Sequence, residues 1–229
     1  MRRKPPSPST GKKRARILLV DDHPLVRERL TEIINREADL IVCGEAEDRH
    51  ETLAAIPAKQ PDLAIIDLAL KNSDGLELIK DIRPRWPGLR ILVVSMHDES
   101  LYAERVIRAG ALGYITKQEA TRNILVAIRR VLEGTIYLND KIASNIISRL
   151  TTHAGAVAAT PAELLSDREL QVFELTGRGL NTVDIADRLR VAVKTIETYR
   201  ARIREKLKLK HSSELLQSAI AWSHTQGNA

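Results

Sequence analysis

Five short apolar runs recur along the first part of the chain, and their starts are 22 to 28 residues apart. They lie at residues 16–20, 39–45, 62–67, 90–95 and 112–117. Segments with the period of an amphipathic helix separate them, as in the stretch from Leu25 to Ile34. Strands that alternate with helices form a parallel sheet with helices on both faces. The pattern therefore predicts a doubly wound, five-stranded parallel α/β domain, and it leaves the order of the strands open.

The pattern changes near residue 150. Residues 151–163 are small and weakly patterned, as is typical of a linker. Beyond them, strand-like runs give way to four helical segments, which we expect at 167–176, 181–189, 193–208 and 212–222. Ser166 and Glu169 have the spacing of a capping box, which marks the start of the first of these helices. The second part of the chain is therefore predicted to be a small all-α four-helix domain.

Charge is distributed unevenly over these parts. Residues 1–16 hold seven Lys or Arg and no acid, residues 17–150 have a net charge of −3, and residues 161–229 have +2. The asymmetry predicts two domains with different partners. The expected boundaries are a basic disordered tail at 1–15, the α/β domain at 16–133, a linker at 134–160 with a helix near 139–150, and the helical domain at 161–226.

Apolar runs such as those at 16–20 and 90–95 are too short to cross a bilayer, and residues 1–16 lack the apolar core of a signal peptide. We therefore expect a cytoplasmic protein that has no membrane partner. The single cysteine, Cys43, excludes an internal disulfide and a cysteine-based zinc cluster. Its apolar surroundings predict a buried packing role.

Polar side chains follow the predicted strands at their carboxyl ends, where parallel α/β sheets bind ligands. They are Asp21, Asp22, Asp67, Ser95 and Lys117. Converging carboxylates repel one another unless a cation joins them, and oxygen ligands favour Mg²⁺. A carboxylate beside a metal ion and a lysine can stay ionised and attack a phosphoryl group. The set predicts a magnesium-dependent phosphoryl acceptor.

The stretches "ILLVDDHPLVRERL", "DLAIIDLALKNSDGLELI", "VVSMHD" and "AGALGYITK" resemble the receiver domain of two-component response regulators over residues 16–133. The resemblance implies that Asp67 is the phosphoacceptor, forming 4-aspartylphosphate. It also implies that Asp22 binds Mg²⁺ directly, that Asp21 acts largely through metal-bound water, and that Ala69 supplies a backbone carbonyl to the metal.

The same resemblance implies that Ser95 and Lys117 contact the phosphoryl group and that Tyr114 is a rotating switch residue. Lys71 stands where the family usually has proline, which leaves the rigidity of that loop and its partner preference open. We interpret His23, which follows the acid pair, as structural rather than catalytic.

Residues 193–210 carry seven Lys or Arg against two Glu. Such a helix can be an ordinary amphipathic helix with a solvated face, or it can contact nucleic-acid phosphates. The preceding helix ends only a few residues earlier, which favours a helix-turn-helix. The surrounding sequence, from "LSDRELQVF" to "RARIREKL", resembles the LuxR-type DNA-binding domain.

That resemblance implies that helix 193–207 enters the major groove and that helix 182–189 supports it. The implied groove-facing residues are Glu197, Thr198 and Ala201, and the implied phosphate contacts are Lys194, Thr195 and Arg202. Glu197 stands where some relatives have lysine. Its carboxylate can either accept a hydrogen bond from a cytosine or repel the DNA phosphates, and the sequence leaves both possibilities open. The last helix, 213–222, can form a dimer contact or pack on its own domain.

Together the two resemblances imply a response regulator of the NarL/FixJ type. Its partners would be a sensor histidine kinase and double-stranded promoter DNA, with a homodimer when phosphorylated. Asp67 would control dimerisation, release of the helix-turn-helix, or both, and the chain would be no enzyme beyond slow self-dephosphorylation. We further expect the α/β domain to lie against helix 193–207 and cover it until phosphorylation; the alternative is constitutive DNA binding.

Three other classes of protein can be tested against the residues that each of them requires. A phosphohydrolase with an aspartate nucleophile needs a second acid two positions later, where this chain has Ala69. A nucleotide-binding Rossmann enzyme needs a glycine-rich turn after the first strand, where this chain has Asp21-Asp22-His23-Pro24. A receiver that works without phosphorylation does not need the complete set of acids, serine and lysine. This chain has the complete set, which argues against that class.

Overall fold

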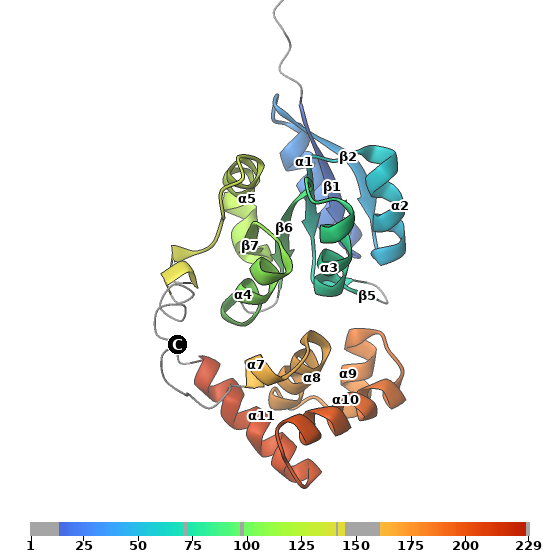
Figure 1. The fold of residues 1–229 in the computed structure, drawn as a ribbon, viewed down its shortest axis with the longest axis vertical. Helices are drawn as coiled ribbons and strands as arrows, with labels where there is room; N and C mark the ends of the chain where they lie inside the picture. Colours follow the sequence, from blue (N-terminus) through green and yellow to red (C-terminus); the bar gives the residue numbers. More distant parts are fainter. Residues whose placement is uncertain (1–13, 71–72, 97–98, 141, 145–160, 228–229) are drawn as a thin grey trace, which may run out of the picture.

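The computed structural model describes residues 14–70, 73–96, 99–140, 142–144 and 161–227. The chain forms two bodies, a sheet domain up to residue 132 and a helical domain from residue 161 (Figure 1). Most of the predicted basic tail and most of the predicted linker lie outside the described residues. Of the helix predicted near 139–150, residues 140 and 142–144 are helical and residue 139 is not, while residues 141 and 145–150 lie outside the described residues.

The sheet domain contains a five-stranded sheet in which every neighbouring pair is parallel. Its strands are β1 (Ala15–Val20), β2 (Leu40–Ala46), β3 (Leu63–Ile66), β6 (Arg90–Ser95) and β7 (Gly113–Thr116). The order is β2-β1-β3-β6-β7, which confirms the predicted doubly wound sheet and supplies the order that the pattern left open. Because β1 and β3 are neighbours, the residues that follow them lie side by side at one edge.

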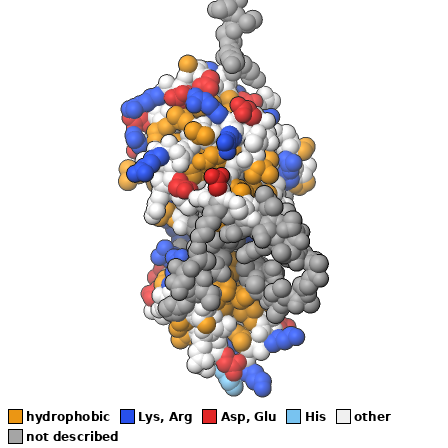
Figure 2. Space-filling model, turned by 90° about the vertical axis from the view of Figure 1, so that its left-hand side faces the viewer, with side chains coloured by type: hydrophobic (Ala, Val, Ile, Leu, Met, Phe, Trp, Pro, Cys, Tyr) orange, Lys and Arg blue, Asp and Glu red, His pale blue; other side chains and the backbone are white. Residues whose placement is uncertain are grey.

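Helices cover both faces of this sheet. One face packs against α1 (Pro24–Asn35) and α5 (Lys117–Leu132), and the other against α2 (Arg49–Lys59), α3 (Gly75–Arg85) and α4 (Glu99–Ala109). Alternate residues of a strand point to opposite faces, so Ile17 packs with one set and Leu18 with the other. Figure 2 shows the side on which α5 lies, where charged side chains of both signs are interspersed with apolar ones.

A short antiparallel ribbon follows β3, which the sequence pattern did not predict. Its strands are β4 (Ala69–Leu70) and β5 (Ser73–Asp74). Asp74 then caps α3, since its side chain accepts a hydrogen bond from the backbone N–H of Leu76 at 2.8 Å. The ribbon and the cap return the chain against the loop that carries Asp67.

Gly75, at the start of α3, makes this close return possible. A Cβ atom there would lie within 3.0 Å of the Asp67 carbonyl oxygen and the Leu68 Cα atom. We expect Gly75→Ala to lower the free energy of unfolding by about 1–3 kcal/mol, because backbone must move to admit the methyl group. Urea denaturation measures this. The matched control is Gly88→Ala, where an added Cβ meets nothing within 4 Å; equal losses would contradict the explanation.

Cys43 is partly rather than fully buried, because it lies on β2 at the edge of the sheet. The burial that it does have raises the pKa of its thiol. Among the described residues, no helix combines the length and the apolar character needed to span a membrane.

The helical domain contains α7 (Pro161–Leu164), α8 (Asp167–Gly177), α9 (Thr182–Leu189), α10 (Val193–Lys206) and α11 (Ser212–Gly227). The four predicted helices are present as α8 to α11, and α7 is a short addition. At the capping box, the Ser166 backbone N–H donates to Glu169 Oε2 at 2.8 Å. Buried apolar residues, among them Phe173 and Ile203, join α8, α10 and α11 into one core.

The two domains dock through α8 and the end of α9, while α10 and α11 lie on the side away from the sheet (Figure 1). At the start of α8, Asp167 forms an ion pair with Arg105, and Lys80 Nζ lies 3.0 Å from Asp167 Oδ2. The neighbouring Arg168 donates from Nη2 to the Ser73 carbonyl oxygen at 2.5 Å. These charged contacts fix which face of the helical domain meets the sheet domain.

The prediction that the sheet domain covers helix 193–207 is therefore wrong for this structure. Glu197, Thr198 and Ala201 on α10 are exposed. The reason is electrostatic and local: the start of α8 offers one acid and one base to complementary groups on α3, α4 and β5. The basic face of α10 has no such role in the docked arrangement.

Candidate functional site

An acidic cluster lies at the carboxyl edge of the sheet, where the strand order brings the predicted residues together. Asp21 and Asp22 follow β1, and Asp67 follows β3. Each of these residues and His23 offers a ligand atom, and all four atoms lie within 4.8 Å of one another. Asp67 is only 2% exposed, so its charge depends on its neighbours.

Lys117 joins two of the three carboxylates. Its Nζ lies 2.6 Å from Asp21 Oδ2 and 2.7 Å from Asp67 Oδ2. Burial raises the pKa of Asp21, the Asp67 carboxylate raises it further, and Lys117 opposes both. Burial alone would lower the pKa of Lys117, but Asp67 and Asp21 outweigh it and raise that pKa. The lysine therefore stays charged beside Asp67.

The cluster suits a hard divalent cation. Its carboxylates supply oxygen ligands only, which Mg²⁺ prefers. Asp22 Oδ1 is buried without a hydrogen bond, although His23 Nδ1 is 2.7 Å away. A cation would satisfy that oxygen and reduce the repulsion between Asp21 and Asp67. Ala69 lies beside the cluster and donates its N–H to Asp67 Oδ1 at 3.3 Å; its carbonyl as a metal ligand stays a prediction.

The two predicted switch residues lie on neighbouring strands. Ser95 ends β6, Tyr114 belongs to β7, and both side chains are fully buried. Strand pairing places Ser95 opposite Thr116, directly before Lys117. The structure thus puts Ser95 close to the acidic edge and Tyr114 deeper in the sheet, and their roles in switching stay predictions.

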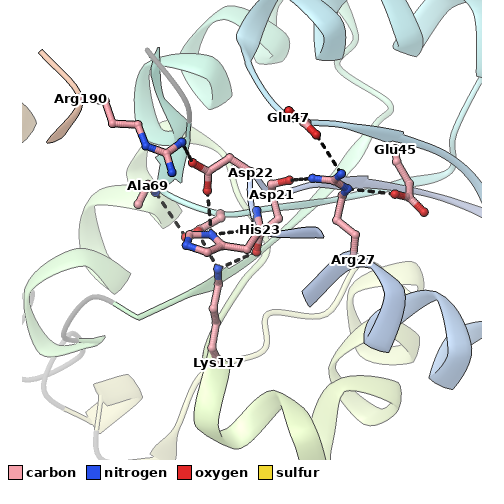
Figure 3. A network of polar contacts seen from close by, with 10 residues as sticks. Asp21, Asp22, His23, Arg27, Glu45, Glu47, Ala69, Lys117 and Arg190 are labelled. Atoms are coloured by element: carbon pink, nitrogen blue, oxygen red, sulfur yellow. Dashed lines mark hydrogen bonds and ion pairs between the residues drawn. The ribbon is translucent and has the colours of Figure 1, made fainter. Parts of the chain in front are cut away.

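Three further residues contact the acids: His23, which the sequence analysis named as structural, and two arginines that it missed (Figure 3). The His23 ring, read as structural, lies 3.0 Å from Asp21 Oδ1 as well as near Asp22. Arg27, one helical turn further along α1, donates to the Asp21 carbonyl oxygen at 2.6 Å. Its spacing from His23 was a usable signal, because positions four apart share a helix face.

The third is Arg190, which reaches the cluster from the helical domain and forms an ion pair with Asp22. The two residues are 168 positions apart, so no local pattern predicts their contact.

A cavity of about 500 Å³ lies between the domains in front of Asp67. From the sheet domain it is lined by residues of the acidic edge, and from the helical domain by α8 and α9. The lining includes Asp67, Ala69, Met96, Lys117, Gln171, Glu174, Arg178 and Arg188. The Asp67 side chain therefore faces a space that the helical domain covers.

The helix predicted to enter DNA is a separate surface. Ile196 and Ile203 of α10 are buried, and Arg200 Nη1 donates to Thr182 Oγ1 at 2.8 Å, which fixes α10 against α9. The opposite face presents the predicted DNA contacts. Lys194, Glu197, Thr198, Ala201 and Arg202 are exposed, and Thr195 is partly buried. Lys194 Nζ lies 3.3 Å from Glu197 Oε2, which partly offsets the charge of Glu197.

Comparison with known proteins matches both domains. The family model described as "Response regulator receiver domain" matches residues 17–129, and "Bacterial regulatory proteins, luxR family" matches residues 163–219. The oxygen regulatory protein NreC of Staphylococcus haemolyticus is 32% identical over 209 residues, which cover 90% of this chain and 96% of NreC. This chain is a LuxR-type response regulator. NreC of Staphylococcus carnosus matches it equally, at 32% identity over 209 residues.

Solved structures of other response regulators resemble it as well. A LuxR-family regulator from Aurantimonas sp. SI85-9A1 is 35% identical, with a TM-score of 0.56, over 61% of this chain and 99% of that one. RcsB of Salmonella typhimurium is 24% identical, with a TM-score of 0.63, over 91% of this chain and 98% of RcsB. RcsB thus shares the fold of this response regulator across both domains.

Proposed function

We propose that this response regulator controls transcription through phosphorylation of Asp67 by a sensor histidine kinase. The observation that carries the proposal is the position of Asp67, buried beside Asp21 and 2.7 Å from Lys117, at the sheet edge of a chain that also has an exposed basic helix. Receiver domains bind Mg²⁺ at an acidic pocket, and the three carboxylates of this cluster fit that ion.

The chemistry follows from the residues around Asp67. A carboxylate oxygen of Asp67 attacks phosphorus and forms an acyl phosphate, and the departing group keeps the electron pair of its bond. Asp21, Asp22 and Asp67 would hold Mg²⁺, which neutralises phosphoryl charge when bound. Lys117 Nζ, already beside Asp67, pairs with a phosphoryl oxygen, and the Ser95 hydroxyl donates a hydrogen bond to another. We assign no turnover beyond slow self-dephosphorylation.

The DNA-binding part of the proposal rests on α10. Its exposed basic face is suited to phosphates, and we assign the exposed Glu197, Thr198 and Ala201 to contacts with base edges. Structures of RcsB show that protein bound to promoter DNA, and one shows two RcsB dimers on two parallel DNAs. For this chain we propose promoter DNA and a phosphorylated homodimer, with the exposed Leu216 and Ile220 of α11 as a candidate contact.

The direct test is uptake of a phosphoryl group from acetyl phosphate by the full-length protein. We expect the intact mass to increase by one phosphoryl group with Mg²⁺ present, and no increase once EDTA removes the metal. Asp22→Ala should weaken Mg²⁺ binding and slow uptake. Uptake that is indifferent to EDTA would contradict the proposed site, and steady release of phosphate from simple phosphate esters would favour a phosphohydrolase.

A further inference from the structure

The ion pair between Arg190 and Asp22 joins the helical domain to the acidic cluster itself (Figure 3). The guanidinium contacts Asp22 Oδ2, the partner oxygen of the buried Oδ1 that has no hydrogen bond. The Asp22 side chain is 4% exposed and the Arg190 side chain 48%. A cation from the other domain therefore already occupies one side of a carboxylate that the proposed function gives to Mg²⁺.

The backbone at Arg190 is unusual for an arginine. Arg190 is the C-cap of α9 with φ of +53°, a left-handed conformation that glycine or asparagine adopts at lower cost. Its N–H bonds back to the Ala186 and Asp187 carbonyl oxygens. The side chain leaves from the turn that joins α9 to α10. A residue poorly suited to this backbone thus stands where its side chain reaches the acidic cluster.

We infer that Arg190 competes with Mg²⁺ for Asp22, so that docking of the helical domain weakens metal binding at the phosphorylation site. If both need Asp22 Oδ2, they exclude one another. If the metal ion takes Oδ1 instead, it lies beside a guanidinium of like charge, and the repulsion still opposes binding. This inference rests on the proposed function, because it concerns the metal ion that the acidic cluster would hold.

The coupling acts in both directions. By linkage, a docked domain that lowers the affinity for Mg²⁺ is itself loosened by Mg²⁺ to the same extent. The contacts at the start of α8, where Asp167 pairs with Arg105 and Arg168 bonds Ser73, lie apart from the metal ligands and remain. Mg²⁺ alone therefore loosens the end of α9 without separating the domains.

The test is the Mg²⁺ affinity of the full-length protein, measured by titration calorimetry. Arg190→Gln keeps a comparable backbone cost and a polar side chain but removes the charge and, being shorter, the contact with Asp22; we expect Mg²⁺ to bind about three- to tenfold more tightly. Arg190→Lys should stay close to wild type. The matched control is Arg188→Gln, which removes an exposed arginine that lines the same cavity and should leave the affinity nearly unchanged.

A second measurement follows docking directly. Amide hydrogen exchange in the turn after α9 should increase with Mg²⁺ in the wild-type protein, and should already be high without Mg²⁺ in Arg190→Gln. Wild-type affinity in Arg190→Gln, or an equal gain in Arg188→Gln, would overturn the inference while leaving the proposed function standing. A wild-type protein that neither binds Mg²⁺ nor accepts a phosphoryl group would instead overturn the proposed function, and the inference with it.

Discussion

Asp67→Asn is expected to abolish phosphoryl uptake while the protein stays folded. The amide that replaces the carboxylate is not a nucleophile toward phosphorus, and of the three carboxylates of the cluster only Asp67 both pairs with Lys117 and lines the interdomain cavity. The side chain keeps its size, and the loss of its pairing with Lys117 is partly offset because repulsion of Asp21 is also lost. Intact-mass spectrometry after treatment with acetyl phosphate and Mg²⁺ measures the outcome.

The control for this change is Glu28→Gln, which makes the same carboxylate-to-amide replacement at an exposed position on α1. It should take up a phosphoryl group at the wild-type rate. Thermal unfolding of both variants separates loss of the acceptor from loss of the fold. Labelling of Asp67→Asn at the level of Glu28→Gln would mean that another residue is the acceptor.

The second large effect concerns DNA. In the phosphorylated full-length protein, Arg202→Ala should weaken binding to every sequence and lower the slope of log affinity against log salt by about 1, as loss of one phosphate contact does. Thr198→Ala should instead change which sequences are preferred, because a good base contact discriminates by about 1–3 kcal/mol. Titration against a panel of duplexes at several salt concentrations distinguishes the two.

Arg85→Ala is the charge-matched control, since it removes an exposed arginine at the end of α3, in the sheet domain. It should alter neither the salt slope nor the preference. If Arg202→Ala and Thr198→Ala change binding to all duplexes in the same proportion, the division of α10 into phosphate contacts and base contacts is wrong.

The strands and helices could be predicted because their signals are local. Leu63–Ile66 is an unbroken apolar run, and the helices α8 to α11 repeat apolar residues at helical spacing. The acidic edge could be predicted too, because parallel strands bring their carboxyl ends to one side. The β4–β5 ribbon could not, since two-residue strands have no periodicity.

The way in which the two domains dock could not be predicted from the sequence, for a different reason. The contacts of Asp167 with Arg105 and of Arg190 with Asp22 each join residues far apart in the chain. From the sequence, several other exposed charged residues were equally good candidates for ion pairs between the domains. The expectation that α10 is the docked helix rested only on the linker at 151–163, which permits many arrangements of the two domains. The structure instead docks α8, where an acid and a base stand next to each other and find complementary partners.

The cavity over Asp67 limits which phosphoryl donors can reach this residue while the domains are docked. With the helical domain docked, Asp67 opens onto a space of about 500 Å³, enough for a small metabolite-sized donor but far too small for a folded kinase domain. Acetyl phosphate should therefore react with the docked form, whereas a phosphohistidine on a kinase domain should reach Asp67 only after the helical domain has moved away from the cavity. Domain docking would then select phosphoryl donors by size. The rate of domain opening would limit phosphorylation by the kinase but not phosphorylation by acetyl phosphate.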